Sequence, residues 1–465
     1  MTTQVQALVV GAGISGLAAA YALKKAGIPT IVFEASARPG GAIQSIQRDG
    51  FLVECGPQSF RGNAALRTLC KDLGLLDERI FADPKARRYV LIDGKLENLP
   101  MGPGLLVSPF MAGGTLFAVL RDLLGSSHPP EPDESVAAFV RRKFNPTLLD
   151  RLVGPFVSGV YAGDPEKLSL RAAFPILYEA ETAKASLIRG AVAIRRARQA
   201  NRGGTPLEKP TLQSFRHGNE TLIRALAKTL EDQLFCDVEV TAVDALDPGH
   251  EAKAARFHLT LATARGTEHI EAERLVLACP AAAAGRILSR LSAQFESQLT
   301  RIESVPVGVV SLGYRQADVA ERLKGFGFLV PRSCGLNVLG NVWNSSLFPG
   351  RAPQGHVLLT SFVGGATNRA IIERAPDQLV SLVHREISPL LSIRQAPVFS
   401  NVTIWPRAIP QYDLGHTALL ATVEKLRASF PGLHFAGSHL QGPAIGTCVE
   451  QALKVADEIR VSFAN

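Results

Sequence analysis

The chain of 465 residues is longer than one ordinary domain, so we expect two or three domains. Hydrophobic residues make up 46% of it and charged residues 20%, a balance that excludes an intrinsically disordered chain and predicts a large core. Six cysteines are scattered without a C-x-x-C pair, which argues against a disulfide framework or a structural zinc site and fits a reducing compartment.

The chain begins with an expected strand, a glycine-rich turn, a helix and a second strand. An apolar strand over 5–10 leads into Gly11-Ala12-Gly13-Ile14-Ser15-Gly16, a helix ends at Gly27, and a strand over 30–33 delivers Glu34. Such glycines permit a tight turn and the close approach of a pyrophosphate, the helix N-terminus offers N–H groups, and the acid accepts from a ribose hydroxyl. This order of elements predicts a dinucleotide-binding site. The chain enters its first strand at once, so we expect no signal or transit peptide.

The residues after Glu34 narrow the choice of dinucleotide. Arg38-Pro39-Gly40-Gly41 resembles the extension of FAD-dependent oxidases, in which backbone and an arginine wrap the diphosphate. A plain nicotinamide domain would normally lack it. The resemblance therefore implies FAD.

Short elements follow in the next segment of the chain. We expect a strand entering the Gly56-Pro57 turn, an amphipathic helix over 63–74, and a β-hairpin over 88–99 with Asp93-Gly94 at its turn. Residues 98–120 carry no charge, a length sufficient to span a bilayer. Their three prolines and four glycines would leave backbone groups unpaired in lipid, so we expect an apolar loop and helix, buried or lying on a membrane.

Most of the net charge of +8 lies in one stretch, residues 184–209. This stretch has a net charge of +6, from seven basic residues and one acid. They are Lys184, Arg189, Arg195, Arg196, Arg198, Arg202 and Lys209, and Glu208. No interleaved aromatics or nucleic-acid-binding module accompany them, so we expect no nucleic acid partner. Apolar residues between the arginines favour an anionic membrane surface or an acidic substrate, and a solvated basic loop is the alternative.

The second half of the chain alternates strands and helices and returns to the first domain. We expect strands within 236–280, a mixed α/β segment over 281–400, a strand over 433–437 and a helix from near 444 to 460. The fold class is therefore α/β, with a discontinuous Rossmann-type FAD-binding domain, a mixed α/β substrate domain and a helical, membrane-facing subdomain. Their predicted extents are 1–80, 206–280 and 411–465 for the FAD domain, 81–97 and 281–410 for the substrate domain, and 98–205 for the helical subdomain.

Several segments beyond the FAD fingerprint resemble the oxygen-dependent protoporphyrinogen oxidase family, within the wider group of amine oxidases and phytoene desaturases. The segments are RYVLIDGKLENLP at 88–100, SGVYAGD at 158–164, LSLRAAFP at 168–175, GFGFLVP at 325–331 and IPQYDLGH at 409–416. The likeness extends nearly from end to end. IPQYDLGH is a specific run that a generic flavoprotein would not need.

Site residues are carried over from this resemblance position by position. It implies one non-covalent FAD per chain, with contacts at Gly11, Ala12, Gly13, Ile14, Ser15, Gly16, Glu34, Ala35, Arg38, Gly41, Ala42, Gly56, Pro57, Gln58, Ser59, Val240, Trp405, Pro443, Ala444 and Ile445. Among these, Val240 would offer its backbone to the adenine end, and Trp405 is equally well explained as a structural aromatic. A helix beginning near Ala444 would direct N–H groups toward the flavin edge where negative charge develops on reduction.

The resemblance also implies a porphyrinogen site. Arg88 would pair with a propionate because guanidinium clamps a carboxylate with two hydrogen bonds, and Arg87 is its alternative. Phe326, Leu329 and Phe362 would sandwich the tetrapyrrole, and the Gly159 carbonyl would accept from pyrrole N–H groups. From their types alone the three apolar residues are core strand residues.

The implied reaction is the six-electron oxidation of protoporphyrinogen IX to protoporphyrin IX, with O2 as acceptor and hydrogen peroxide as product. We assign no catalytic acid or base and no metal ligand: His217, His416, His434 and His439 are candidates by type only. Oxidation of coproporphyrinogen III to coproporphyrin III is the nearest alternative, and a polyene desaturase or a non-turning-over tetrapyrrole carrier is more distant. Pro443 is not aromatic and no cysteine lies between Trp405 and Phe435, which disfavours amine oxidation and covalent flavin.

The apolar stretch over 104–124 and the basic stretch together predict a peripheral contact with an anionic membrane. We expect a cytoplasmic location, with peripheral attachment to the inner face of the cell membrane, and a monomer or homodimer.

Overall fold

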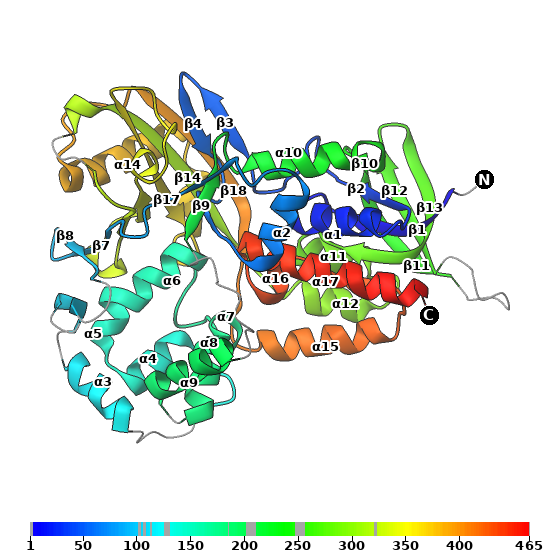
Figure 1. Ribbon diagram of the computed structural model, residues 1–465, viewed down its shortest axis with the longest axis horizontal. Helices are drawn as coiled ribbons and strands as arrows, with labels where there is room; N and C mark the ends of the chain where they lie inside the picture. Colours follow the sequence, from blue (N-terminus) through cyan, green and yellow to red (C-terminus); the bar gives the residue numbers. More distant parts are fainter. Residues whose placement is uncertain are drawn as a thin grey trace.

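The computed structural model describes residues 3–100, 104–105, 108–111, 114–124, 131–184, 186–200, 211–246, 256–319 and 323–464. Residues 201–210, which the glycines and prolines in them predict to be a linker and which include Arg202, Glu208 and Lys209 of the basic stretch, lie outside these residues. Figure 1 shows two large sheets side by side, with a helical subdomain below one of them and both chain ends at the far edge of the other. The predicted mixed α/β architecture is confirmed.

The first large sheet carries the glycine-rich turn. Its strand order is β10-β2-β1-β13-β12-β11, and β19 pairs with β13. β10, β2, β1, β13 and β19 run parallel, whereas β12 and β11 are antiparallel additions. The strands are β1 (Thr3–Val10), β2 (Thr30–Phe33), β10 (Leu234–Phe235), β11 (Glu239–Ala245), β12 (Phe257–Thr263), β13 (Gly266–Leu277) and β19 (Leu433–Phe435).

Helices cover both faces of this sheet, because the side chains of β1 alternate between two cores. Ala7 and Val9 enter a core shared with α1, α2, α10 and α17, whereas Leu8 and Val10 enter a core shared with α11, α12 and α15. The helices are α1 (Ile14–Lys25), α2 (Ala64–Asp72), α10 (Glu220–Thr229), α11 (Ala281–Ile287), α12 (Ala293–Leu299), α15 (His416–Ala428), α16 (Ser438–Gln441) and α17 (Ile445–Ala464).

The second large sheet has the order β18-β14-β17-β16-β15-β7-β8. Helix α14 (Pro376–Leu391) packs its apolar stripe on one face, and the other face is turned toward the remaining domains. The strands are β7 (Arg88–Ile92), β8 (Lys95–Asn98), β14 (Ser304–Arg315), β15 (Gly327–Leu329), β16 (Val338–Val342), β17 (His356–Gly364) and β18 (Phe399–Pro410). Shorter elements on this side are η5 (Gln316–Asp318), η6 (Arg332–Cys334), α13 (Asn344–Leu347) and η7 (Arg369–Glu373).

Two small sheets join the large ones. β3 (Ser45–Arg48) pairs with β4 (Phe51–Glu54), and β9 (Leu212–Phe215) lies between β5 (Phe60–Arg61) and β6 (Arg79–Phe81). The short turn η4 (Glu231–Gln233) precedes β10.

The helical subdomain is tied together by buried charges. Lys143, only 3% exposed, lies 2.7 Å from Glu181 and 3.4 Å from Asp122. Asp122 also accepts hydrogen bonds from the backbone N–H groups of Leu187 and Ile188, at the N-terminus of α9. The elements are η2 (Pro109–Met111), α3 (Thr115–Leu124), α4 (Val136–Lys143), α5 (Pro146–Leu148), η3 (Leu149–Val153), α6 (Gly154–Tyr161), α7 (Leu170–Ala173), α8 (Pro175–Lys184) and α9 (Leu187–Ala200). Within the described ranges, no helix combines the length and apolar character needed to cross a membrane.

Most expected elements are confirmed, with three differences. The run Glu131-Pro132-Asp133-Glu134 predicts a helix that opens there, whereas α4 begins at Val136, because the Ser135 side chain accepts from Ala138 N and caps the helix. The boundary between the FAD-binding and substrate domains is predicted at residue 280. Helices α11 and α12 follow this residue, but they pack on the first sheet. The short helix α16 was not expected, since four residues give no periodic signal.

Candidate functional site

The glycine-rich turn lies where β1 passes into α1. Gly11 has φ +99°, a conformation that a side chain would strain, and a Cβ on Gly16 would overlap the Gly11 carbonyl oxygen. A Cβ on Gly13 would meet nothing within 4 Å, so the space in front of the α1 N-terminus is open there. Gly41 borders this same space, since its Cβ would be 3.6 Å from Gly13 Cα. Two glycines therefore leave a gap at a helix N-terminus, where a diphosphate binds well.

Glu34 is held beside the turn by backbone donors. Its Oε2 accepts from Ala12 N at 2.7 Å, and its Oε1 accepts from Ser36 N at 2.9 Å. The Glu34 backbone is paired with Phe235 and with Val238, whose N–H donates to the Glu34 carbonyl at 3.0 Å. Val238 directly precedes β11, and Val240, the second residue of that strand, is buried and paired with Leu261. The contact expected between the Val240 backbone and the adenine end stays a prediction.

The segment after Glu34 folds back over the turn. Arg38 donates to the carbonyls of Gly41 at 2.7 Å and Pro39 at 3.2 Å, and Gly40 N donates to Ala12 O at 2.8 Å. The guanidinium thus closes the loop on itself. Beyond it, Ala35 and Ala42 are exposed at the edge of the gap.

A second helix N-terminus meets the first. α17 begins at Ile445 after Pro443 and Ala444, and it packs along α1 in one core. Ala444 is exposed whereas Ile445 is buried, which turns the start of the helix toward the open side. Two sets of unpaired N–H groups and two positive dipole ends therefore converge.

The loop 56–59 is braced from three sides. Trp405 Nε1 donates to the Cys55 carbonyl at 2.7 Å, Asn219 Nδ2 donates to the Pro57 carbonyl at 2.7 Å, and Asn344 Nδ2 donates to Gln58 Oε1 at 2.6 Å. Ser59 is half-buried at the end of the loop. The indole N–H of Trp405 is thus used structurally, to fix the backbone that enters Gly56.

Behind this loop lies a buried ion pair that sequence reasoning missed. Glu54 and Arg351 are each 1% exposed and approach to 3.5 Å, and Arg351 also donates to Ser214 Oγ at 2.5 Å. Glu54 accepts from Ser45 Oγ and from Asn219 N. Burial nevertheless raises the pKa of Glu54 to about 7, against the lowering effect of Arg351 and these donors. No local pattern joins two residues so distant in sequence.

These observations fit a dinucleotide that ends in a flavin. Gly13 and Gly41 leave space in front of the α1 N-terminus, the Glu34 carboxylate accepts from Ala12 N beside it, and α17 begins at Ile445 in the core that it shares with α1. The donors are backbone N–H groups, as phosphates and a reduced flavin edge require.

The second sheet presents an apolar face that helix α6 partly covers. Leu329 of β15 and Phe362 of β17 both pair with Gly340 of β16, so their side chains stand on one face with no side chain between them. A Cβ on Gly159 of α6 would overlap the Leu329 side chain, which places this helix directly over the same face. The structure therefore places Gly159 against Leu329, with Phe362 on the same sheet face, and their role as a substrate site stays a prediction.

Arg88 borders the same face. It pairs across β7–β15 with Gly327, and its guanidinium lies 5.7 Å from the centre of the Phe326 ring. Phe326 and Phe362 pack into one cluster, so the arginine and both aromatics are neighbours. Arg87 is exposed, and its carbonyl accepts from Phe326 N, so its role in this region is that of backbone.

The histidines named by type are mostly buried and neutral. Burial lowers the pKa of His416, His434 and His439 to about 4, so at pH 7 none of the three carries charge. His217 is exposed. In the described part of the chain, no cluster of His, Cys, Asp or Glu is arranged to hold a metal ion.

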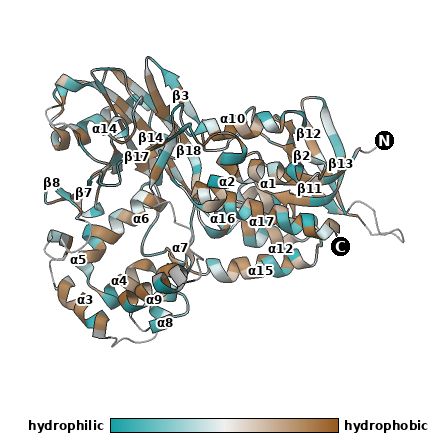
Figure 2. Ribbon diagram, viewed as in Figure 1, coloured by the Kyte–Doolittle hydropathy of each residue, from teal (hydrophilic) through white to brown (hydrophobic). Residues whose placement is uncertain are grey.

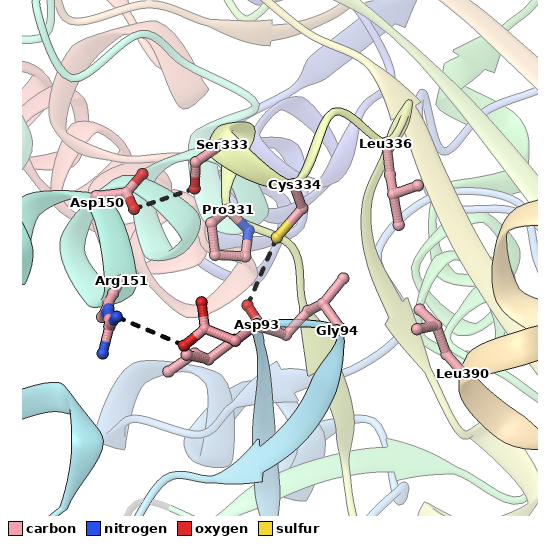
Figure 3. Close-up of a pocket in the computed structure, with 11 residues that line it drawn as sticks. Asp93, Gly94, Asp150, Arg151, Pro331, Ser333, Cys334, Leu336 and Leu390 are labelled. Atoms are coloured by element: carbon pink, nitrogen blue, oxygen red, sulfur yellow. Dashed lines mark hydrogen bonds and ion pairs between the residues drawn. The ribbon is translucent and has the colours of Figure 1, made fainter.

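A cavity of about 460 Å³ lies elsewhere, between the β7–β8 turn, η3 and η6. Figure 3 shows Arg151 reaching Asp93 and Ser333 reaching Asp150 across it, with the Cys334 thiol directed at the β7 backbone. None of the five predicted substrate residues lines this cavity. Its polar groups are mutually satisfied, which makes it a joint between the substrate sheet and the helical subdomain.

Fold and site together define a flavin-dependent oxidoreductase with a nucleotide-binding sheet and a second large sheet. The chain belongs to the flavin containing amine oxidoreductase family, which matches residues 14–460, and within it to the protoporphyrinogen oxidases. The prediction of a flavin enzyme of this family is confirmed.

The relatives bear two names. The chain is 36% identical to the chloroplastic protoporphyrinogen oxidase of Nicotiana tabacum, over 98% of this chain and 85% of the relative. It is 29% identical to the coproporphyrinogen III oxidase of Bacillus subtilis, over 98% of both chains. A crystal structure of an Exiguobacterium protein assigned as a protoporphyrinogen oxidase superposes with a TM-score of 0.81 at 23% identity, over 99% of this chain and all of that one. At that identity the likeness shows the fold alone.

Proposed function

We propose that the protein oxidises protoporphyrinogen IX to protoporphyrin IX, using FAD as cofactor and O2 as acceptor, in porphyrin and heme biosynthesis. The reaction removes six electrons and six protons from the substrate, and three O2 take them up as three hydrogen peroxide. FAD, when bound, supplies the two-electron acceptance that each of the three rounds requires. One FAD binds non-covalently per chain.

The protein residues hold the cofactor and orient the substrate. The gap between Gly13 and Gly41 takes the diphosphate, Glu34 takes the ribose, and the backbone from Pro443 to Ile445 faces the flavin. Loop 56–59, braced by Trp405, forms the side of the cofactor site nearest the substrate sheet. No acid or base of this chain is assigned to a proton transfer.

One observation carries the choice of substrate: Leu329 and Phe362 flank Gly340 on one sheet face, with Arg88 beside them. A flat apolar macrocycle fits between two apolar side chains separated by a glycine, and a guanidinium at the margin suits a propionate. The name of the tobacco relative supports the same choice.

Anaerobic mixing tests the oxidase function. The holoenzyme is mixed with protoporphyrinogen IX without O2, and we expect loss of flavin absorbance together with the appearance of porphyrin fluorescence. Readmission of O2 should restore the flavin band and yield hydrogen peroxide. If the flavin band never bleaches, the proposed oxidase function is wrong and a carrier role takes its place.

Coproporphyrinogen III is the second candidate substrate, because relatives from Bacillus subtilis and Staphylococcus aureus bear the name coproporphyrinogen III oxidase. The chemistry is the same, and the substrate carries two further propionates in place of vinyl groups. Parallel kcat/KM measurements for both porphyrinogens, read by porphyrin fluorescence, decide between them. We expect the higher value for protoporphyrinogen IX.

We further propose that the helical subdomain contacts an anionic membrane on its cytoplasmic side. Helix α3 exposes large apolar side chains, of which Phe117 is 71% and Leu120 is 51% exposed, and Figure 2 shows its hydrophobic character. The basic helix α9 packs beside α3 and exposes Arg189, Val192 and Arg196. An apolar surface next to cations suits anionic lipid headgroups.

A further inference from the structure

A second arginine stands beside Arg88. Arg61 ends β5 and is exposed, whereas its neighbour Phe60 points the other way, into the core of the nucleotide half. Across the strand pair, Arg61 lies opposite Leu212 of β9, and Leu212 packs in the same cluster as Phe326. Arg61 therefore borders the substrate face from the side opposite β7.

The backbone of Arg61 also lies close to the cofactor side. A Cβ on Gly446, in the first turn of α17, would be 3.2 Å from the Arg61 carbonyl oxygen. The arginine thus stands at the seam where the helix N-terminus assigned to the flavin meets the substrate sheet. A ligand placed between the two sheets would pass along it.

Arg61 and Arg88 are like charges that border one apolar cluster, Arg61 through Leu212 and Arg88 through Phe326. Burial lowers the pKa of Arg88 most, and the positive charge of Arg61 lowers it further. Among the residues that the structure describes, neither side chain makes an ion pair or hydrogen bond with a carboxylate. Two adjacent cations repel each other, and an anionic ligand relieves that repulsion.

We propose that Arg61 and Arg88 act together as a clamp for two carboxylates carried on one edge of the substrate. The proposal rests on the proposed function, because protoporphyrinogen IX carries its two propionates on neighbouring pyrroles of one edge. One guanidinium meets each propionate, and the apolar remainder of the macrocycle lies against Phe326, Leu329 and Phe362. Arg61 is then a substrate-binding residue that no resemblance assigned.

The proposed clamp can be tested by measuring porphyrin binding, without turnover. The FAD-loaded protein is titrated with protoporphyrin IX and with its dimethyl ester, and binding is followed by porphyrin fluorescence. For the diacid we expect R61Q to raise Kd about tenfold, the low end for one charge-assisted hydrogen bond at a partly exposed site. For the diester, which lacks both carboxylates, R61Q should leave Kd unchanged. R61K keeps the positive charge but loses the planar guanidinium that donates two parallel hydrogen bonds. Its Kd for the diacid should therefore lie between those of R61Q and the unsubstituted protein.

A matched control replaces an arginine on another surface. Arg265 lies in the β12–β13 turn with its side chain 87% exposed, and R265Q should bind both porphyrins as the unsubstituted protein does. The same titrations are repeated at high salt, where the difference between diacid and diester should shrink. FAD content, measured from the absorbance ratio of each preparation, should be equal in all variants.

Failure of the clamp differs from failure of the oxidase function. If the unsubstituted protein oxidises protoporphyrinogen but R61Q binds the diacid with unchanged Kd and turns over with unchanged KM, the clamp is wrong and the function stands. If R61Q loses FAD rather than porphyrin affinity, Arg61 belongs to the cofactor site and the clamp is also wrong. If the flavin never bleaches, the oxidase function fails, while the diacid–diester comparison still reports on the clamp.

Discussion

Replacing Arg351 with methionine removes the buried counter-charge of Glu54 behind the 56–59 loop. The two side chains are 3.5 Å apart and 1% exposed, and Arg351 also donates to Ser214 Oγ and the Phe215 carbonyl. Methionine keeps much of the apolar volume and offers no donor. We expect R351M to destabilise the fold by an amount that depends on pH.

The magnitude follows from the protonation of Glu54. Burial raises its pKa from 4.5 to about 7 in the folded protein, so the folded state binds the proton more tightly than the unfolded chain. Stability attributable to Glu54 therefore falls as pH rises from 4.5 to 7, by about 3 kcal/mol, and is constant above 7. Without Arg351 the pKa of Glu54 rises further, and the decline continues above pH 7 at about 1.4 kcal/mol per pH unit.

Two pH values separate the two contributions. At pH 5.5 Glu54 is protonated in both folded proteins, so R351M loses only its hydrogen bonds to Ser214 and Phe215, about 2 kcal/mol. At pH 8 the unsubstituted protein has an ionised, paired Glu54, and R351M should lose about 1.4 kcal/mol more.

Urea unfolding at pH 5.5 and pH 8, followed by tryptophan and flavin fluorescence, measures both values. The matched control is R351M in an E54Q background, where no titrating group remains and the cost of R351M should be the same at both pH values. An equal cost of R351M at pH 5.5 and 8 in the Glu54 protein would contradict the assigned pKa. So would a pH-dependent cost in the E54Q background.

Three further predictions concern the cofactor and the membrane. G16A should abolish FAD retention on gel filtration, because the added Cβ overlaps the Gly11 carbonyl oxygen, and retention equal to that of the unsubstituted protein would refute the tight turn. W405F should weaken FAD binding about fivefold through loss of the hydrogen bond to the Cys55 carbonyl, as read by flavin fluorescence on dilution; an unchanged Kd would show that the loop is fixed without it. F117E should reduce cosedimentation with anionic liposomes at low salt while leaving turnover unchanged, and undiminished binding would remove α3 from the contact.

The nucleotide-binding half is predictable from the sequence because its signals are local. The run from Gly11 to Gly16 lies between a strand and a helix, and Glu34 ends the next strand, all within one continuous segment. Asn63 caps α2 by accepting from Leu66 N, as its position before the amphipathic run predicts. Each of these features depends on neighbours in the chain, so a single sequence suffices to find it.

The substrate side depends on pairings between distant segments, which periodicity does not contain. That Leu329 and Phe362 share Gly340 as their cross-strand partner follows from the register of three strands. Arg61 ends a strand of two residues, too short to give a pattern, and only its position opposite Leu212 reveals the face it borders. The resemblance implies Arg88 and the apolar residues as site residues, whereas only the strand pairing identifies Arg61 as their neighbour.

In the proposed substrate site, missing side chains matter as much as the residues present. A Cβ on Gly340 would stand 3.2 Å from Leu329 Cδ2, and one on Gly159 would overlap the same leucine. Any larger residue at either position would push Leu329 into the space that separates it from Phe362, or close that space directly. In the proposed binding mode a wide, thin, apolar ligand lies against this face, because it exchanges water for apolar surface. A narrow amine would cover less of this apolar face than a macrocycle does. A similar cofactor site can therefore serve a different substrate in a protein whose second sheet presents a different surface.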